Sequence, residues 1–168
     1  MLIVARSMKE LSFPKLMEVY MEGNRENGAL RYPEETPERQ QALAEEDFRD
    51  YLSQVFFHGE NPVYLILTTE GRYVSALRLE DYEDGVLLEA LETAPGQRQK
   101  GYASELLREA ANYLQGRAPV RLYAHVAKKN TASMKTHLSQ GFRQCLDYAR
   151  YIDGTVSRNA VTLVLDIF

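Results

Sequence analysis

Two hydrophobic patterns alternate along this chain of 168 residues, one typical of strands and the other typical of helices. Short runs of apolar and β-branched residues predict strands at 2–5, 63–68, 73–79, 86–93, 120–126, 142–152 and 160–167. Apolar residues spaced three and four apart predict helices at 12–22, 37–56, 103–114 and 130–140. This order predicts an α/β (α+β) fold with a mostly antiparallel sheet.

Start and stop signals support these boundaries. Thr36 can cap a helix whose first position is Pro37, and Gly116 follows the end of the third predicted helix. Gly71 lies in the short connection between the second and third predicted strands, which indicates a hairpin. Residues 24–33 are rich in Gly, Asn and charge, and they predict an exposed loop.

Length and composition are those of one globular domain over residues 1–168. About 45% of the residues are apolar and 26% are charged. No apolar stretch approaches the length of a membrane span, so no membrane association is predicted. Charged residues occur too early for a signal peptide, and we therefore expect a cytoplasmic location.

Charge and cysteine content exclude further classes. A net charge of −4 argues against a nucleic-acid partner, which normally requires a basic face. Cys145 is the single cysteine, so the chain has no internal disulfide and no cysteine-rich metal site. The three histidines lack the spacing of metal ligands, and no metal site is predicted.

The segment 87–103 carries the candidate chemistry. A strand runs into a loop containing Gly and basic residues, and this loop opens directly into an amphipathic helix. A helix start has unpaired backbone N–H groups and favours anions, and the small residues Gly101 and Ala103 would let a phosphate approach the backbone. Neither a P-loop nor a GxGxxG fingerprint is present. Taken alone, this turn is more typical of a helix start without a ligand.

Two spaced patterns give the segment a family context. The first is Arg98-x-x-Gly101-x-Ala103, and the second is Asn130-x-x-Ser133-x-x-x-His137-x-x-x-Gly141-Phe142. In these patterns and their order, the chain resembles the Gcn5-related N-acetyltransferase (GNAT) family, closely over about 87–142 and in element order elsewhere. The resemblance implies a single GNAT-type domain with a mixed six- to seven-stranded sheet and about four helices. It also implies a coenzyme A-binding core at about 87–142.

The resemblance further implies an activity. The chain would transfer an acetyl group from acetyl-CoA to an amine of a small molecule or peptide, by direct attack in a ternary complex without metal or covalent intermediate. The implied cofactor-binding residues are Leu91, Glu92, Thr93, Arg98, Gln99, Lys100, Gly101, Tyr102, Ala103, Asn130 and Ser133. Asn130 could also act as a helix N-cap. A homodimer is left open, and nothing in the sequence identifies the acceptor.

The catalytic residues implied by the resemblance are His137 and Glu89. His137 occupies the position where the family usually has a Tyr that protonates the coenzyme A thiolate. Tyr123 and Tyr102 are alternative donors. Strand alternation predicts that Glu89 shares a face with Leu91 and Thr93, opposite Glu92, and Glu89 is the expected general base.

Other interpretations stay open from sequence alone. Cys145 could in principle form an acyl-enzyme, although a lone cysteine after a helix is usually a small buried hydrophobe. The unusual His137 also fits a non-catalytic acyl-CoA-binding or sensing module of the same fold. An unrelated phosphate-binding α/β domain would show no preference for coenzyme A over simple nucleotides.

Overall fold

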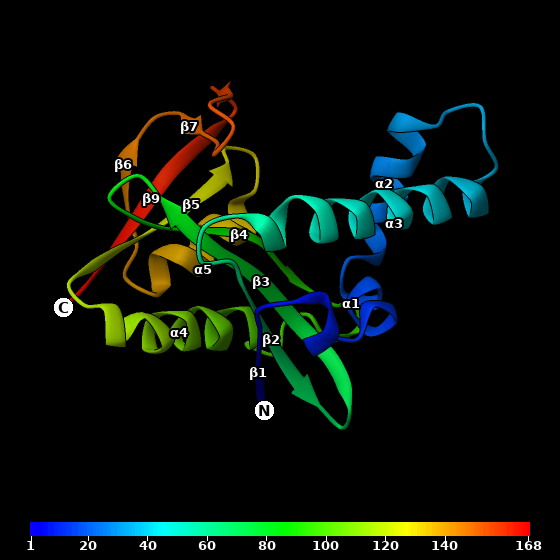
Figure 1. Cartoon of the computed structure of the whole chain (residues 1–168). Helices are drawn as coiled ribbons and strands as arrows, with labels where there is room; N and C mark the ends of the chain where they lie inside the picture. The colour runs from blue at the N-terminus through cyan, green and yellow to red at the C-terminus, as the bar shows by residue number, and fades with distance from the viewer.

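The computed structural model describes all residues 1–168 and contains a seven-stranded sheet covered by helices on both faces (Figure 1). In spatial order the strands are β1 (Leu2–Ala5), β2 (Val63–Thr69), β3 (Arg72–Tyr82), β4 (Gly85–Thr93), β5 (Val120–Ala127), β9 (Ala160–Ile167) and β6 (Arg143–Leu146). All neighbours are antiparallel except β4 and β5, which are parallel. The predicted α+β class and strand number are confirmed.

Helices lie on both sides of this sheet, α4 and α5 on one and α1–α3 on the other (Figure 1). The α-helices are α1 (Phe13–Val19), α2 (Met21–Arg31), α3 (Pro37–Gln54), α4 (Tyr102–Leu114) and α5 (Thr131–Ser139). Short 3-10 segments are η1 (Met8–Glu10), η2 (Phe56–His58), η3 (Pro95–Gln97) and η4 (Gln115–Arg117).

Each face of the sheet has its own hydrophobic core. The larger core packs the apolar stripe of α4 against the sheet, with Leu106, Leu107 and Ala110 almost fully buried. The smaller core joins α1, α3 and η2 to the other face around Leu16, Leu52, Phe56, Tyr64 and Ile66. This two-sided burial explains why β2 and the middle of β3 are nearly continuous apolar runs.

The predicted loop at 24–33 is wrong, because most of this segment belongs to α2. Asn24 is buried and its side-chain amide contacts the Met17 sulfur at 3.3 Å. A β-carbon on Gly28 would lie 2.3 Å from the Gln40 carbonyl oxygen, so Gly28 lets α2 and α3 pack with their backbones in close approach. Gly and Asn here serve helix packing rather than a turn. The chain therefore has five α-helices instead of about four.

The C-terminal strand predicted at 142–152 is divided in the structure. Within this segment, only β6 pairs with β9, and the register of that pairing shifts between Gln144 and Leu146. The chain then leaves the sheet and forms a separate ribbon of β7 (Ala149–Arg150) and β8 (Val156–Ser157). The Thr162 hydroxyl donates to the Tyr148 carbonyl oxygen at 2.6 Å, which ties this departure to β9.

The close approach of α2 and α3 predicts opposite effects for two glycines of one helix. Gly28→Ala should destabilise the fold by about 1–3 kcal/mol, because the added methyl overlaps the Gln40 carbonyl. Gly23→Ala should stabilise it by roughly 0.5–1 kcal/mol, because nothing lies within 4 Å of the added carbon. Urea unfolding measures both values, and equal changes in the two variants would contradict this packing.

Candidate active site

The site begins where β4 separates from β5. The two strands pair only over three residues, Val86–Leu88 against Leu122–Ala124. Beyond Leu88 the edge of β4 has no partner strand on that side, so its backbone groups border a gap in the sheet. Ala90 has a φ of 52°, and the β3–β4 register shifts there. This β-bulge increases the local twist and ends the parallel pairing.

The bulge overturns the predicted arrangement of side chains on β4. Three residues of β4, Ala90 to Glu92, advance the register by only two positions of β3, so Glu89 and Glu92 both face the α1–α3 side of the sheet. Leu91 packs against the α4 core on the other side. Thr93 is on that side too, with its hydroxyl 3.1 Å from that of Ser75. Glu89 therefore does not share a face with Leu91 and Thr93, because the extra residue breaks simple alternation.

A chain of buried tyrosines holds the bulge in place. The Tyr20 hydroxyl donates to the Ala90 carbonyl oxygen at 2.7 Å, and the Tyr64 hydroxyl donates to Tyr20 at 2.9 Å. Burial raises the pKa of Tyr20 well above its usual value and the pKa of Tyr64 to about 12. Both side chains are therefore neutral donors at physiological pH. No sequence signal distinguishes Tyr20 from an ordinary core tyrosine.

The turn between β4 and α4 presents unpaired backbone amides. Gln99 and Gly101 have φ values of 60° and 82°, and α4 begins at Tyr102. The first backbone hydrogen bond of the helix start is from Glu105 to Gly101. The N–H groups of residues 98–104 have no acceptor within the protein. A β-carbon on Gly101 would meet no atom within 4 Å, so the space beside Gly101 is open.

A cavity of about 740 Å³ lies in front of this turn. It is lined by Leu91, Glu92, Thr93, Gln97, Arg98, Gln99, Gly101, Tyr102, Ala103, Ser104, Asn130, Ala132, Ser133 and Thr136. All the predicted cofactor-binding residues except Lys100 are in this set, although they come from three separate segments. The first turns of α4 and α5 both border the cavity, and a helix N-terminus carries partial positive charge.

Three predicted cofactor residues also have structural contacts. Asn130 is the N-cap of α5, since its side-chain oxygen accepts from the Ser133 N–H at 3.0 Å. The Arg98 guanidinium pairs with Glu22 at 2.7 Å and with Glu92 at 3.4 Å, which joins the turn to α2. The Lys100 ammonium donates to the Gln97 side chain at 3.0 Å.

His137 is buried and does not line the cavity. Its Nδ1 lies 2.8 Å from the Ser133 carbonyl oxygen, which can only accept, so Nδ1 carries the proton. Its Nε2 is buried without a partner, and burial lowers the pKa of the imidazole. The ring also packs edge-on against Phe142 at 5.1 Å. A neutral imidazole with its one proton already donated is poorly placed to act as the predicted acid.

The alternative residues lie in different surroundings. Tyr102 borders the cavity, whereas the Tyr123 hydroxyl donates to Asp84 at 2.5 Å on the loop between β3 and β4. Cys145 is exposed on β6 rather than buried, and desolvation raises the pKa of its thiol. No group of His, Cys, Asp and Glu side chains is arranged to hold a metal ion.

Besides Glu92, the α1–α3 side of the sheet carries three charged groups near the bulge. Glu89 on β4 is the cross-strand neighbour of Arg78 on β3, and Glu80 lies two residues further along β3. Burial raises the pKa of Glu89 while Arg78 lowers it, with a net rise. Burial and the Glu89 charge raise the pKa of Glu80 to about 7. Arg78 had no sequence signal beyond being a charged residue inside an apolar strand.

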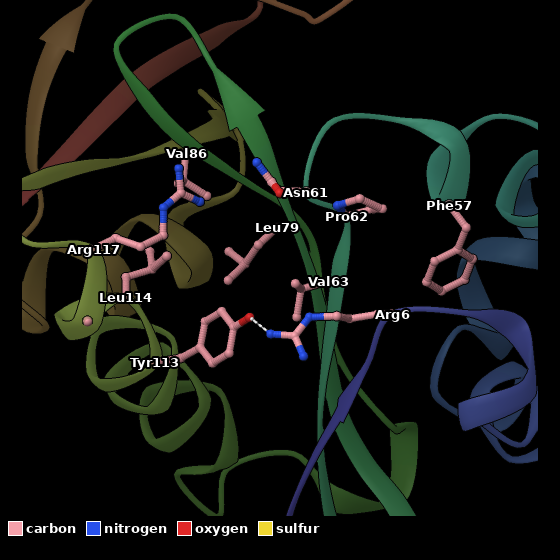
Figure 2. A pocket seen from close by; sticks show the side chains of 11 residues that line it. Arg6, Phe57, Asn61, Pro62, Val63, Leu79, Val86, Tyr113, Leu114 and Arg117 are labelled. Carbon is pink, nitrogen blue, oxygen red and sulfur yellow. Dashed lines mark hydrogen bonds between the residues drawn. The ribbon is translucent and has the colours of Figure 1, made fainter.

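A second cavity, of about 690 Å³, lies at the opposite end of α4 (Figure 2). Its floor is formed by core residues, and the side chains of Arg6 and Tyr113 meet across it through a 2.7 Å hydrogen bond (Figure 2). Arg117 on its rim pairs with Asp81 at 2.8 Å. None of the predicted site residues lines this cavity, so the candidate chemistry belongs to the first one.

The site thus combines a mixed sheet that opens at its parallel pair with two helix N-termini beside the opening, an arrangement that favours an anionic ligand. A model of the acetyltransferase (GNAT) family matches residues 24–142. The chain therefore belongs to the acetyltransferase (GNAT) family. Membership confirms the predicted family, which is a family of acetyltransferases.

Individual relatives are distant. Streptothricin acetyltransferase of Streptomyces lavendulae is 30% identical over 94 residues, which are 55% of this chain, and the chain spans about half (49%) of the length of that curated relative. The ribosomal-protein-S18-alanine N-acetyltransferase of Escherichia coli has a similar fold, with a TM-score of 0.64 at 19% identity over 99% of this chain and 94% of its own. PaiA N-acetyltransferase of Thermoplasma acidophilum, solved with coenzyme A, has a TM-score of 0.64 at 13% identity over 99% of each chain. No helix of the structure combines the length and apolarity needed to cross a membrane.

The raised pKa of Glu80 predicts a pH-dependent stability. Its folded-state pKa of about 7 exceeds the ordinary 4.5, so the folded state binds the proton more tightly and stability falls as pH rises through that interval. Glu80→Gln should remove this loss, so the substitution should raise the free energy of unfolding by on the order of 1–2 kcal/mol more at about pH 8 than at about pH 5. Urea unfolding at both pH values measures it, with Glu34→Gln on an exposed loop as control. Equal changes in the free energy of unfolding at the two pH values would contradict a raised pKa for the Glu80 carboxyl.

Proposed function

We propose that this chain transfers the acetyl group of acetyl-CoA directly to the amine of a small molecule or peptide while both are bound. The observation that carries the proposal is the row of unpaired amides at residues 98–104, which faces a cavity that ends at the gap between β4 and β5. A donor held by its diphosphate at this turn would extend its thioester toward the gap. An acceptor on the α1–α3 side would then meet it there.

The residues around the cavity fit such a donor. The free N–H groups of the turn and the first turn of α4 would bind the pyrophosphate, and the open space at Gly101 would admit it. The exposed edge of β4 at Leu91–Thr93 would pair with the pantetheine amides, as an added strand does. The Leu91 N–H is the proposed donor to the thioester oxygen, on which charge develops during attack.

The departing thiolate needs no histidine in this proposal. His137 is neutral and outside the cavity lining, whereas Asn130 and Ser133 in the first turn of α5 border it. The partial positive charge of this helix start favours a thiolate nearby. A thiolate whose thiol has an ordinary pKa near 8.5 is only modestly basic, so solvent can supply its proton at neutral pH.

Glu89 is the proposed general base for the amine. It precedes the bulge by one residue, and its Oε2 is buried without a hydrogen-bond partner. Burial raises the pKa of this carboxyl, which makes its anion a stronger base. Its position on the α1–α3 face places it on the side opposite the Leu91 side chain, where an acceptor would approach.

Binding of the diphosphate is tested by adding one negative charge beside the turn. Ala103→Asp should weaken coenzyme A binding at least about tenfold, because the new carboxylate would repel phosphate. Because an aspartate is favourable at a helix start, the substitution should leave the free energy of unfolding unchanged or raise it by about 0.3–1 kcal/mol. Isothermal titration and urea unfolding measure the two effects. Asn112→Asp, which adds the same charge further along α4, should bind normally, and equal losses in both variants would argue against this site.

Catalysis is tested by thiol release from acetyl-CoA over a panel of amines, with the acetylated product identified by mass spectrometry. Glu89→Gln should lower kcat about 10²–10⁴-fold at neutral pH, because general base catalysis contributes that much. Its coenzyme A affinity should stay unchanged, and activity should partly return at high pH, where the ammonium group of the acceptor loses its proton without help. A fall in activity that does not depend on pH would argue for a structural role of Glu89.

The rival function gives a different pattern in the same assay. A non-catalytic acyl-CoA-binding module would be stabilised against heat by acetyl-CoA yet release no thiol with any amine. Initial rates at varied concentrations of both substrates should give intersecting lines if the two are bound together. Parallel lines, with an acetylated protein detected, would instead point to a covalent route.

A further inference from the structure

Arg78 has an unusual environment on the acceptor side of the sheet. Its guanidinium carbon lies 4.9 Å from the ring centre of Tyr51, 5.4 Å from that of Phe56 and 6.0 Å from that of Phe48. These rings come from α3 and η2 and form an aromatic surround for the cation. The charge is thus held in a fixed place by packing.

No protein group completes the hydrogen bonding of this cation. Arg78 takes part in none of the ion pairs or side-chain hydrogen bonds of the structure, and its Nε is buried without a partner. An arginine normally presents its donors in a planar fork to a carboxylate or phosphate. The side chain is only partly buried, so part of it is open to a ligand.

Glu89 is the nearest acidic partner by register, and it is also unpaired. Arg78 and Glu89 are directly opposite each other on β3 and β4, where β-carbons are about 4.5–5.5 Å apart. Their charged ends nevertheless form no contact within 4.0 Å, and Glu89 Oε2 is buried without a partner. Partly buried charged groups without partners are costly, so two opposite charges left unpaired side by side point to a ligand that carries the complementary pair.

The position of this pair relates it to the proposed reaction. Glu89 is adjacent to the bulge at Ala90, where β4 leaves β5 and the thioester is expected. Neighbouring strands are about 4.8 Å apart, so Arg78 on β3 is one strand further from the gap. A ligand bound to both would therefore present its cationic end nearer the gap and its anionic end farther away.

We propose that the acceptor is an amino acid, whose carboxylate binds Arg78 while its amine lies at Glu89. This inference rests on the proposed transferase function and narrows its acceptor. The amine and carboxylate of an amino acid are separated by only one or two carbons, which suits two charges on adjacent strands. A polyamine or other purely cationic acceptor fits less well, because the fixed Arg78 charge would repel it and the hydrogen-bond donors of Arg78 would stay unpaired.

The test compares each common α-amino acid with its own carboxamide as acceptor, alongside polyamines that lack a carboxylate. For the best acceptor, kcat/KM should be at least about tenfold higher for the acid than for the amide, because only the acid can pair with Arg78. Arg78→Met should bring this ratio close to one, chiefly by raising KM for the acid. Arg78→Lys should retain part of the preference, since it keeps the charge without the fork.

Controls separate recognition from folding. Arg72→Met makes the same replacement at an exposed position at the start of the same strand, and it should keep the full ratio. A purely structural role of Arg78 would lower the rates for acid and amide together and leave the ratio unchanged. That result would overturn the proposal, and so would turnover confined to amines without a carboxylate. Thermal stabilisation by acetyl-CoA without thiol release for any amine would reject the transferase function itself, and this inference with it.

Discussion

The β-bulge at Ala90 is the constraint on which the rest of the site depends. A non-glycine residue with φ near 52° is in a sparsely populated backbone region, and the hydrogen bond from Tyr20 to its carbonyl helps to hold it there. The bulge ends the pairing of β4 with β5 after Leu88 and frees the edge of β4 for a ligand. It also turns Glu89 and Glu92 to one face, so the same distortion makes the gap and places the charges beside it.

The two faces of the sheet differ in chemical character around this gap. On the α4 side, helix N-termini and unpaired amides suit an anionic, extended molecule, and the apolar stripe of α4 fixes the turn by deep burial. On the α1–α3 side, aromatic rings and the charged pair Arg78 and Glu89 suit a small polar molecule. The Arg98–Glu22 ion pair links the two sides through α2, although an exposed pair of this kind contributes only about 0–1 kcal/mol.

Sequence alone predicts the turn that lines the cavity well and the arrangement on the α1–α3 side of the sheet poorly, for physical reasons. The turn before α4 is local, because Gly101, its neighbours and the apolar stripe follow one another along the chain. The bulge carries no such signal, since Ala90 is not a residue type that marks positive φ, and simple alternation then assigns Glu89 to the wrong face. The packing of α2 depends on Gly28 meeting α3, a contact invisible in a segment that otherwise has the composition of a loop.

In the proposed reaction, a general base would lower a larger energetic cost than a general acid would. A lysine-like amine of pKa near 10.4 must lose a proton at pH 7, at a cost of about 4.6 kcal/mol, whereas a thiol of pKa near 8.5 leaves as its anion at a cost of only about 2 kcal/mol. The helix start of α5 can offset part of the smaller cost. A buried, neutral His137 in place of an acid is therefore compatible with turnover, while the loss of Glu89, the proposed base, would leave the larger cost without a protein group to meet it.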